Sequence, residues 1–235
     1  MNLFSERRNT MLQKLKISDY KVSSWSGGTT TQIAIWPPNA LYADRDFLWR
    51  ISSATVDLEE SDFTPLPDYE RLISTLEGEI VLTHNGGEPI KLRPFEVHAF
   101  SGADATHSLG RCRDFNLMLR RGKVTGTVEA LRLTEGPTNL NAGTSIACPL
   151  PPVSEQLLLY CAEGTASAEA AVCLPVEAES SRAGHSERSA GVDEESGSLG
   201  PGEALLFTGP AQLTVKGPAL LIVCRMQMTT PQFKG

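Results

Sequence analysis

A short motif that occurs twice is the feature of this chain that most constrains its fold. Leu92-Arg-Pro-Phe-Glu-Val-His-Ala-Phe100 returns as Leu199-Gly-Pro-Gly-Glu-Ala-Leu-Leu-Phe207, with Leu, Pro, Glu and Phe in register. An upstream Glu77-Gly78 pair has its counterpart in Glu163-Gly164. The second copy is longer between these landmarks, by about the length of an acidic segment at residues 177–196. We therefore predict two copies of one structural unit, with an insertion in the second.

The segments between the turn signals have the composition of strands. Residues 29–36, 47–56 and 115–119 are rich in β-branched, aromatic or other apolar side chains, and no segment keeps a helical period for more than about two turns. Gly and Pro, at 20 and 15 residues, supply many turns. A mostly β chain of this kind removes its exposed sheet edges by closing into barrels or jelly rolls.

Composition excludes several classes of protein. The net charge of −7 disfavours binding to nucleic acid or to an anionic membrane surface. The longest apolar runs are far shorter than the roughly 20 residues of a membrane-spanning helix, and the N-terminus has no secretory signal. The five cysteines show no CxxC spacing, which favours free thiols in a reducing compartment. We expect a cytoplasmic protein, and a homodimer is left open.

Four motifs in the first half of the chain occur in a distinctive order. They are Trp25-Ser-Gly-Gly-Thr-Thr, Trp49-Arg-Ile-Ser-Ser-Ala, the segment from Phe63 to Arg71, and Asp114-Phe-Asn-Leu-Met-Leu-Arg-Arg-Gly. Together with the repeated Leu-x-Pro-x-Glu turn, they resemble the HutD/Ves family, a bicupin family associated with bacterial histidine utilisation. The resemblance implies an all-β fold of the cupin type, a double-stranded β-helix or jelly roll, with two half-similar barrels.

The resemblance and the repeat together predict how the chain is divided. Residues 1–125 are expected to form the N-terminal barrel with a leader, and residues 126–235 the C-terminal barrel. The acidic insertion at 177–196 has few apolar side chains, so we expect it to be a mobile loop. The resemblance also implies a protein without metal or cofactor that binds a small anionic metabolite, such as urocanate or formylglutamate, and modulates histidine utilisation.

The histidines support the expectation of no metal site. A metal-binding cupin uses two histidines two residues apart, with a carboxylate and a third histidine later in the chain. The four histidines of this chain, at positions 84, 98, 107 and 185, include no such pair.

The positive indication of a binding site comes from the parity of two strands. Alternate residues on a strand face opposite ways, so residues 47–56 and 114–120 each present a polar face backed by a mostly apolar one. A guanidinium beside Ser and Asn side chains suits a carboxylate ligand. Parity alone leaves open whether these polar faces meet solvent or line a barrel, and the family resemblance implies that both strands lie in a barrel wall. We therefore predict that the ligand is bound by Arg50, Ser52 and Asn116, with Arg71 as a second cationic candidate. Structural ion pairs, Arg71 with Glu70 or Arg120 with Asp114, are the alternative role for these arginines.

Two other functions remain open from the sequence. One is a metal-independent cupin enzyme, an isomerase or hydrolase of a small carboxylic acid, with His107 and either Asp114 or Glu70 as the acid–base pair. The other is an interaction module that recruits a partner through the acidic insertion. We favour the non-catalytic, ligand-binding function.

Overall fold

The computed structural model describes residues 11–134, 136–142, 155–172, 194–209 and 211–229. These residues form nineteen strands and two short 3-10 helices, η1 (Ile17–Asp19) and η2 (Tyr42–Asp44). Within these ranges no helix has the length and apolar character needed to cross a membrane. The prediction of an all-β chain is confirmed.

Sixteen of the strands fall into two series of eight that follow one another along the chain. The first series is β4 (Trp49–Val56), β5 (Glu60–Asp62), β6 (Tyr69–Glu77), β7 (Ile80–His84), β8 (Ile90–Leu92), β9 (His98–Ser101), β10 (Thr106–Leu109) and β11 (Cys112–Arg120). The second is β12 (Val124–Leu133), β13 (Thr138–Ala142), β14 (Glu155–Gly164), β15 (Ala166–Val172), β16 (Glu194–Leu199), β17 (Ala204–Thr208), β18 (Ala211–Lys216) and β19 (Ala219–Met228). The leading strands are β1 (Met11–Leu15), β2 (Lys21–Trp25) and β3 (Gly28–Trp36).

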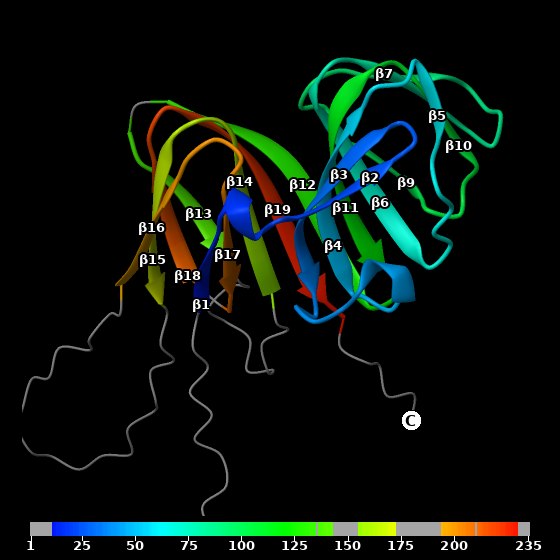
Figure 1. Cartoon of the computed structure of the whole chain (residues 1–235). Coiled ribbons are helices and arrows are strands. Elements are labelled where there is room, and N and C mark those ends of the chain that lie inside the picture. Colours follow the sequence, from blue (N-terminus) through cyan, green and yellow to red (C-terminus); the bar gives the residue numbers. More distant parts are fainter. Residues whose placement is uncertain (1–10, 135, 143–154, 173–193, 210, 230–235) are drawn as a thin grey trace, which may run out of the picture.

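The two series pair their strands in the same way. The pairings of β4 and β6 with β11, of β6 with β9 and of β7 with β8 are repeated by β12 and β14 with β19, β14 with β17 and β15 with β16. The pairings of β10 with β5 and β7 are likewise repeated by β18 with β13 and β15. Each series folds into two antiparallel sheets, so the chain contains two jelly rolls lying side by side (Figure 1). The predicted duplication is therefore present throughout the topology.

The repeated motifs form the same turns in both barrels. The Glu96 carboxylate accepts a hydrogen bond from the Arg93 amide at 3.0 Å, and the Glu203 carboxylate accepts one from the Gly200 amide at 2.8 Å. The residue after each proline has a positive φ, 68° at Phe95 and 83° at Gly202.

The hairpins that follow the Glu-Gly pairs are also alike. Gly78 and Gly164 have φ values of 77° and 74°. A Cβ atom at either position would lie within 2.4 Å of a backbone carbonyl oxygen, of Arg111 or of Pro218. Glycine is therefore required at both hairpins.

The large sheets of the two barrels pack against each other. One has the order β2-β3-β4-β11-β6-β9 and the other β1-β17-β14-β19-β12. Their facing side chains form one apolar cluster that includes Trp49, Phe115 and Leu117 from the first barrel and Leu158 and Ile222 from the second. A separate apolar cluster lies in the C-terminal barrel. The apolar faces of β4 and β11 are thus used between the barrels.

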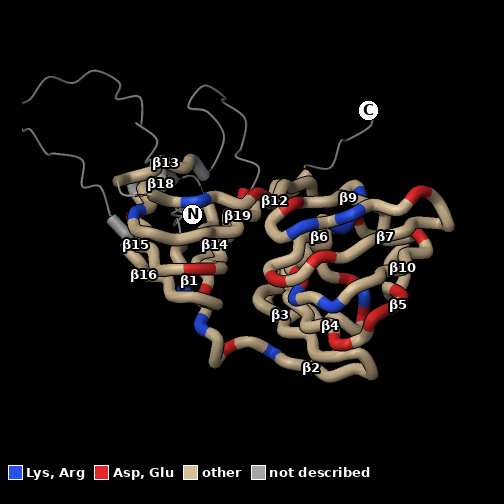
Figure 2. The backbone as a smooth tube through the Cα atoms, turned by 90° about the horizontal axis from the view of Figure 1, so that it is seen from above, with Lys and Arg blue, Asp and Glu red and all other residues tan. Residues whose placement is uncertain are grey.

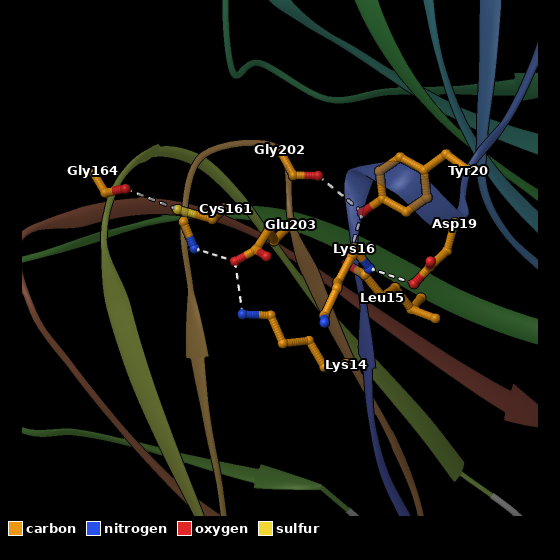
Figure 3. A network of polar contacts seen from close by, with 10 residues as sticks. Lys14, Leu15, Lys16, Asp19, Tyr20, Cys161, Gly164, Gly202 and Glu203 are labelled. Carbon is orange, nitrogen blue, oxygen red and sulfur yellow. Dashed lines mark hydrogen bonds and ion pairs between the residues drawn. The ribbon is translucent and has the colours of Figure 1, made fainter.

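The leader connects the two barrels. β1 pairs with β17 at the edge of the C-terminal large sheet, and the chain then crosses to β2 at the edge of the N-terminal one (Figure 2). The crossing is held where Lys14 pairs with Glu203 at 2.9 Å and the Tyr20 hydroxyl donates to the Gly202 carbonyl at 2.9 Å (Figure 3). The leader strand β1 is therefore part of the C-terminal sheet, although it belongs to residues 1–125, which were expected to form the N-terminal barrel with a leader.

Two other boundaries were expected, one at residue 125 and one around the acidic insertion. The division at residue 125 coincides with the start of β12 at Val124. Of the acidic insertion, residues 177–193 lie outside the described residues, and residues 194–196 begin β16.

Candidate functional site

The polar faces of β4, β6 and β11 line the interior of the N-terminal barrel. In the sheet register, Met118 of β11 lies between Arg50 of β4 and Arg71 of β6, and Asn116 lies opposite Ser52. The opposite faces of β4 and β11 are committed to the core between the barrels. Strand alternation therefore points the polar side chains inward.

These side chains line a cavity of about 280 Å³. All four residues predicted to bind a ligand lie in its wall, and each is at most 7% exposed: Arg50, Ser52, Arg71 and Asn116. Asp114 is a fifth buried polar residue of the wall. More exposed members include Trp25, Tyr42, Asp62 and Phe63.

Arg50 is held in place by its neighbours. Its Nε donates to Gln32 Oε1 and its Nη1 to Ser52 Oγ, both at 2.9 Å. Its guanidinium carbon lies 4.3 Å from the centre of the Tyr42 ring, a cation–π contact. Burial lowers the pKa of Arg50, but a guanidinium remains charged at neutral pH. Ser52 thus orients Arg50, and the second terminal nitrogen of Arg50 is left for a ligand.

The Arg71 guanidinium lies against two aromatic rings and makes no hydrogen bond to the described residues. Its guanidinium carbon lies 4.7 Å from the ring centre of Phe63 and 5.1 Å from that of Phe100. Its buried Nε has no partner. Burial lowers its pKa to about 10, so it is still a cation at neutral pH. A buried guanidinium with unused donors in a cavity wall is a strong candidate for an anion contact.

The acceptors of the cavity are Asp114 and Asn116. Asp114 Oδ1 accepts a hydrogen bond from the Ala54 amide at 2.7 Å. Burial raises the pKa of the Asp114 carboxyl to about 6, although the Ala54 amide and the two arginines act in the opposite direction. Asn116 Oδ1 is buried without a partner. The buried wall therefore carries two cations against one carboxylate.

The alternative roles considered for these residues do not occur in the structure. Glu70 pairs with Arg121 at 3.1 Å rather than with Arg71. The Arg120 guanidinium donates to the Arg45 carbonyl at 3.1 Å rather than to Asp114. Neither of the predicted structural ion pairs forms, because the side chains point to different partners.

Among the described residues, His107 contacts carboxylates other than the two considered for an acid–base pair. His107 Nδ1 lies 2.8 Å from Asp62 Oδ1, and its Nε2 lies 3.9 Å from Glu60. β10 pairs with β5 and places His107 opposite Asp62.

Two residues of the wall were missed as ligand contacts by sequence reasoning. Tyr42 lies on a 3-10 helix that is too short to be predicted from a periodic pattern in the sequence. Phe63 lies in the loop that follows β5. Asp114 was considered only as a partner of His107 or Arg120. Its place on the same face as Asn116 was the signal for a cavity role.

The fold brings together two histidines that are separated in the sequence. Nε2 of His84 lies 2.9 Å from Nε2 of His98, and Nδ1 of His84 lies 2.8 Å from Thr106 Oγ1. Within the described ranges, no three His, Cys, Asp or Glu side chains are grouped closely enough to hold a metal ion. The absence of a native metal stays a prediction.

Two jelly rolls of the same topology, joined in one chain, define a bicupin. The family model described as HutD matches residues 17–221. The chain belongs to the HutD family, as the sequence motifs predicted.

Solved structures show the same fold. PA5104 of Pseudomonas aeruginosa PAO1 is 24% identical, with 94% of this chain and 100% of that chain covered and a TM-score of 0.69. HutD of Pseudomonas fluorescens SBW25 is 20% identical, with coverage of 94% and 100% and a TM-score of 0.65. Vicilin of hazelnut, Corylus avellana, is 8% identical, with coverage of 92% and 86% and a TM-score of 0.58. These likenesses establish the cupin fold. No curated protein sequence matches the chain.

Proposed function

We propose that this protein binds a small carboxylate metabolite in the N-terminal cavity and, when occupied, modulates histidine utilisation without catalysing a reaction. Urocanate and formylglutamate are the ligands proposed for it. The observation that carries the proposal is the Arg71 guanidinium, buried in the cavity wall with no hydrogen bond to the described residues. Desolvating a cation without a partner is costly, and an anionic ligand would supply that partner.

Arg50 complements Arg71 on the other side of Met118. Both guanidinium groups are held by rings or hydrogen bonds, so little side-chain entropy would be lost when a ligand binds. A volume of about 280 Å³ lies just below the usual range for small-molecule sites, which begins near ~300 Å³, and suits a compact metabolite. The structure of HutD of Pseudomonas fluorescens is named for a formate condition, and formate is the smallest carboxylate probe.

The ligand-binding proposal is tested by titrating the purified protein with formate, urocanate and formylglutamate. Binding is measured by calorimetry and by the rise in melting temperature. Arg71→Ala should weaken binding by about 10- to 150-fold, because a charge-assisted hydrogen bond contributes roughly 1.5–3 kcal/mol. Arg71→Lys should recover only part of the loss, since an ammonium cannot form the bidentate contact. Arg50→Ala should weaken binding by a factor in the same range.

Arg111→Ala is the matched control. This arginine is on the same barrel but is exposed and paired with Glu59 at 3.1 Å, so its loss should leave affinity unchanged. Arg71→Ala protein that binds as tightly as the parent, with a lower melting temperature, would show that Arg71 is structural. Consumption of a ligand during the titration would restore the enzyme alternative.

The regulatory part of the proposal needs a test in cells. Replacing the native protein by the Arg71→Ala variant should change histidine-dependent growth and urocanate accumulation in the same direction as deleting the protein. A variant that has lost binding yet behaves as the parent would separate the cavity from any role in regulation.

A further inference from the structure

Asp114 is the buried residue of the cavity whose role the anion-binding proposal leaves unassigned. Its Oδ1 is engaged by the Ala54 amide, while its Oδ2 makes no hydrogen bond to the described residues. The neighbouring Ser53 hydroxyl donates to the Asp114 main-chain carbonyl at 2.6 Å and not to the carboxylate. One carboxylate oxygen of Asp114 is thus available in the wall that holds the two arginines.

The charges around Asp114 come from several elements. Arg50 on β4 and Arg71 on β6 favour its ionised form, although neither donates a hydrogen bond to it. Cys112, on its own strand, is a neutral thiol because burial raises its pKa to about 12. Tyr42 on η2 interacts with both arginines. Asp62, at the exposed end of the wall, is engaged by His107.

An incoming carboxylate would compete with Asp114 for the same two guanidinium groups. It would also place a second negative charge beside Asp114 in a small cavity lined by buried side chains. When two carboxylates share such a site, the proton affinity of one of them rises strongly. Asp114 is the resident group with a free oxygen to receive that proton.

We propose that the cavity takes up its anion together with one proton, which binds to Asp114 Oδ2, so that Asp114 makes anion binding dependent on pH. This inference rests on the proposed function. The charges balance: the wall begins with two guanidinium ions and one carboxylate, and ends with two guanidinium ions, a neutral carboxylic acid and one bound anion. The net charge of the occupied cavity equals that of the empty one.

The coupling fixes the direction of the pH dependence. The pKa of Asp114 in the free protein is about 6, and bound anion raises it further. Below the free-protein value the proton is already present, and affinity is independent of pH. Above it, each pH unit should weaken binding roughly tenfold, until the pKa of the complex is reached.

The test uses formate, which stays ionised over the whole range from about pH 5 to pH 8. Its dissociation constant is measured by NMR titration of the full chain. The ¹³C carboxyl signal of Asp114 is followed in the free and the formate-saturated protein. We expect wild-type affinity to fall roughly tenfold from about pH 6.5 to pH 7.5, and the Asp114 signal at neutral pH to shift to the protonated form when formate binds.

Asp114→Asn separates the coupling from the fold. An asparagine Oδ1 still accepts the Ala54 amide, and it cannot titrate. Formate binding by this variant should be independent of pH and, at about pH 8, tighter than that of the wild type. Asp62→Asn is the control: the carboxylate is exposed and bound to His107, so the wild-type pH profile should persist.

The outcomes distinguish this inference from the function it rests on. Formate binding that depends on Arg71 but not on pH, with Asp114 ionised in the complex, would overturn the proton coupling and leave the anion site intact. Asp114 would then accept a hydrogen bond from the natural ligand. Absence of formate binding at every pH would remove the anion site and the coupling with it.

Discussion

A carboxylate as deeply buried as Asp114 changes the stability of the empty protein as well as its affinity for ligands. Its pKa is about 6 in the folded chain and close to 3.8 in the unfolded chain, so the folded state favours the protonated form. The contribution of Asp114 to the free energy of unfolding therefore falls as pH rises from about 4 to 6, and is constant above that range. A destabilising group thus lies where the proposed ligand would bind, and such a compromise between stability and function is common.

Asp114→Asn removes this titration and gives a stability prediction. In formate-free buffer, the free energy of unfolding of the variant relative to wild type should increase by up to about 3 kcal/mol between about pH 4 and pH 7. Urea denaturation at the two pH values measures it. A difference between variant and wild type that stays constant with pH would show that Asp114 is ionised with an ordinary pKa, against the burial argument.

At the scale of the element, the repeated turns were predictable because their determinants are local. The Pro, the following αL position and the carboxylate that accepts an amide three residues upstream all lie within one short motif. Parity of β4 and β11 was also predictable from the sequence, because side chains alternate on any strand. This parity distinguishes the polar face of each strand from its apolar face. It does not predict which of the two faces points into a barrel.

The features that could not be predicted from the sequence are contacts between residues that lie far apart in the chain. The apolar face of β4 turns outward because a second barrel covers it, and β1 joins the far sheet through its pairing with β17. The partners of His107 and Glu70 depend on which strands become neighbours, as does the contact of His84 with His98. No local pattern encodes such contacts, which is why the cavity residues were found more readily than the acid–base pair.

The two turn carboxylates give a matched pair of stability predictions. Glu203→Ala should cost about 1–2 kcal/mol, since it removes the Gly200 hydrogen bond and the partly buried ion pair with Lys14. Glu96→Ala should cost less, about 0.5–1 kcal/mol, because Glu96 is more exposed and its pairing with Arg93 is long, at 3.6 Å. Urea denaturation near neutral pH compares the two variants.

The Glu203 effect should also depend on pH. Hydrogen bonds from Lys14 and Gly200 lower the pKa of Glu203 in the folded chain. Its stabilisation is therefore present above its ordinary pKa and is lost as pH falls through the lowered value. Equal losses for Glu203→Ala at neutral and at strongly acidic pH would contradict this account of the turn.

For the whole molecule, duplication has produced two barrels with different interiors. The C-terminal barrel is filled by apolar side chains such as Leu159, Phe207 and Leu221, whereas the N-terminal barrel keeps a polar cavity. The two are joined by the shared core and by a buried hydrogen bond of 2.7 Å from Trp49 Nε1 to Gln156 Oε1. In this arrangement, the densely packed C-terminal barrel stabilises the large sheet that carries Arg50, Arg71 and Asn116.

The shared core predicts that both barrels unfold in a single transition. Neighbouring residues of β14 provide the test: Leu158 faces the core between the barrels, Leu159 faces the interior of the C-terminal barrel, and both are fully buried. Leu→Ala at either position should cost about 2–5 kcal/mol. All three tryptophans lie in the N-terminal half, and Trp49 also contacts Gln156 of the C-terminal barrel. Their fluorescence therefore reports on the N-terminal barrel and on the core between the barrels, while circular dichroism reports on both barrels. If the molecule is one cooperative unit, Leu159→Ala should lower the urea midpoints of the two signals equally, and so should Leu158→Ala.

A Leu159→Ala protein whose tryptophan transition stays at the wild-type midpoint would mean that the barrels unfold independently. In that case the C-terminal barrel would not stabilise the sheet that carries the cavity.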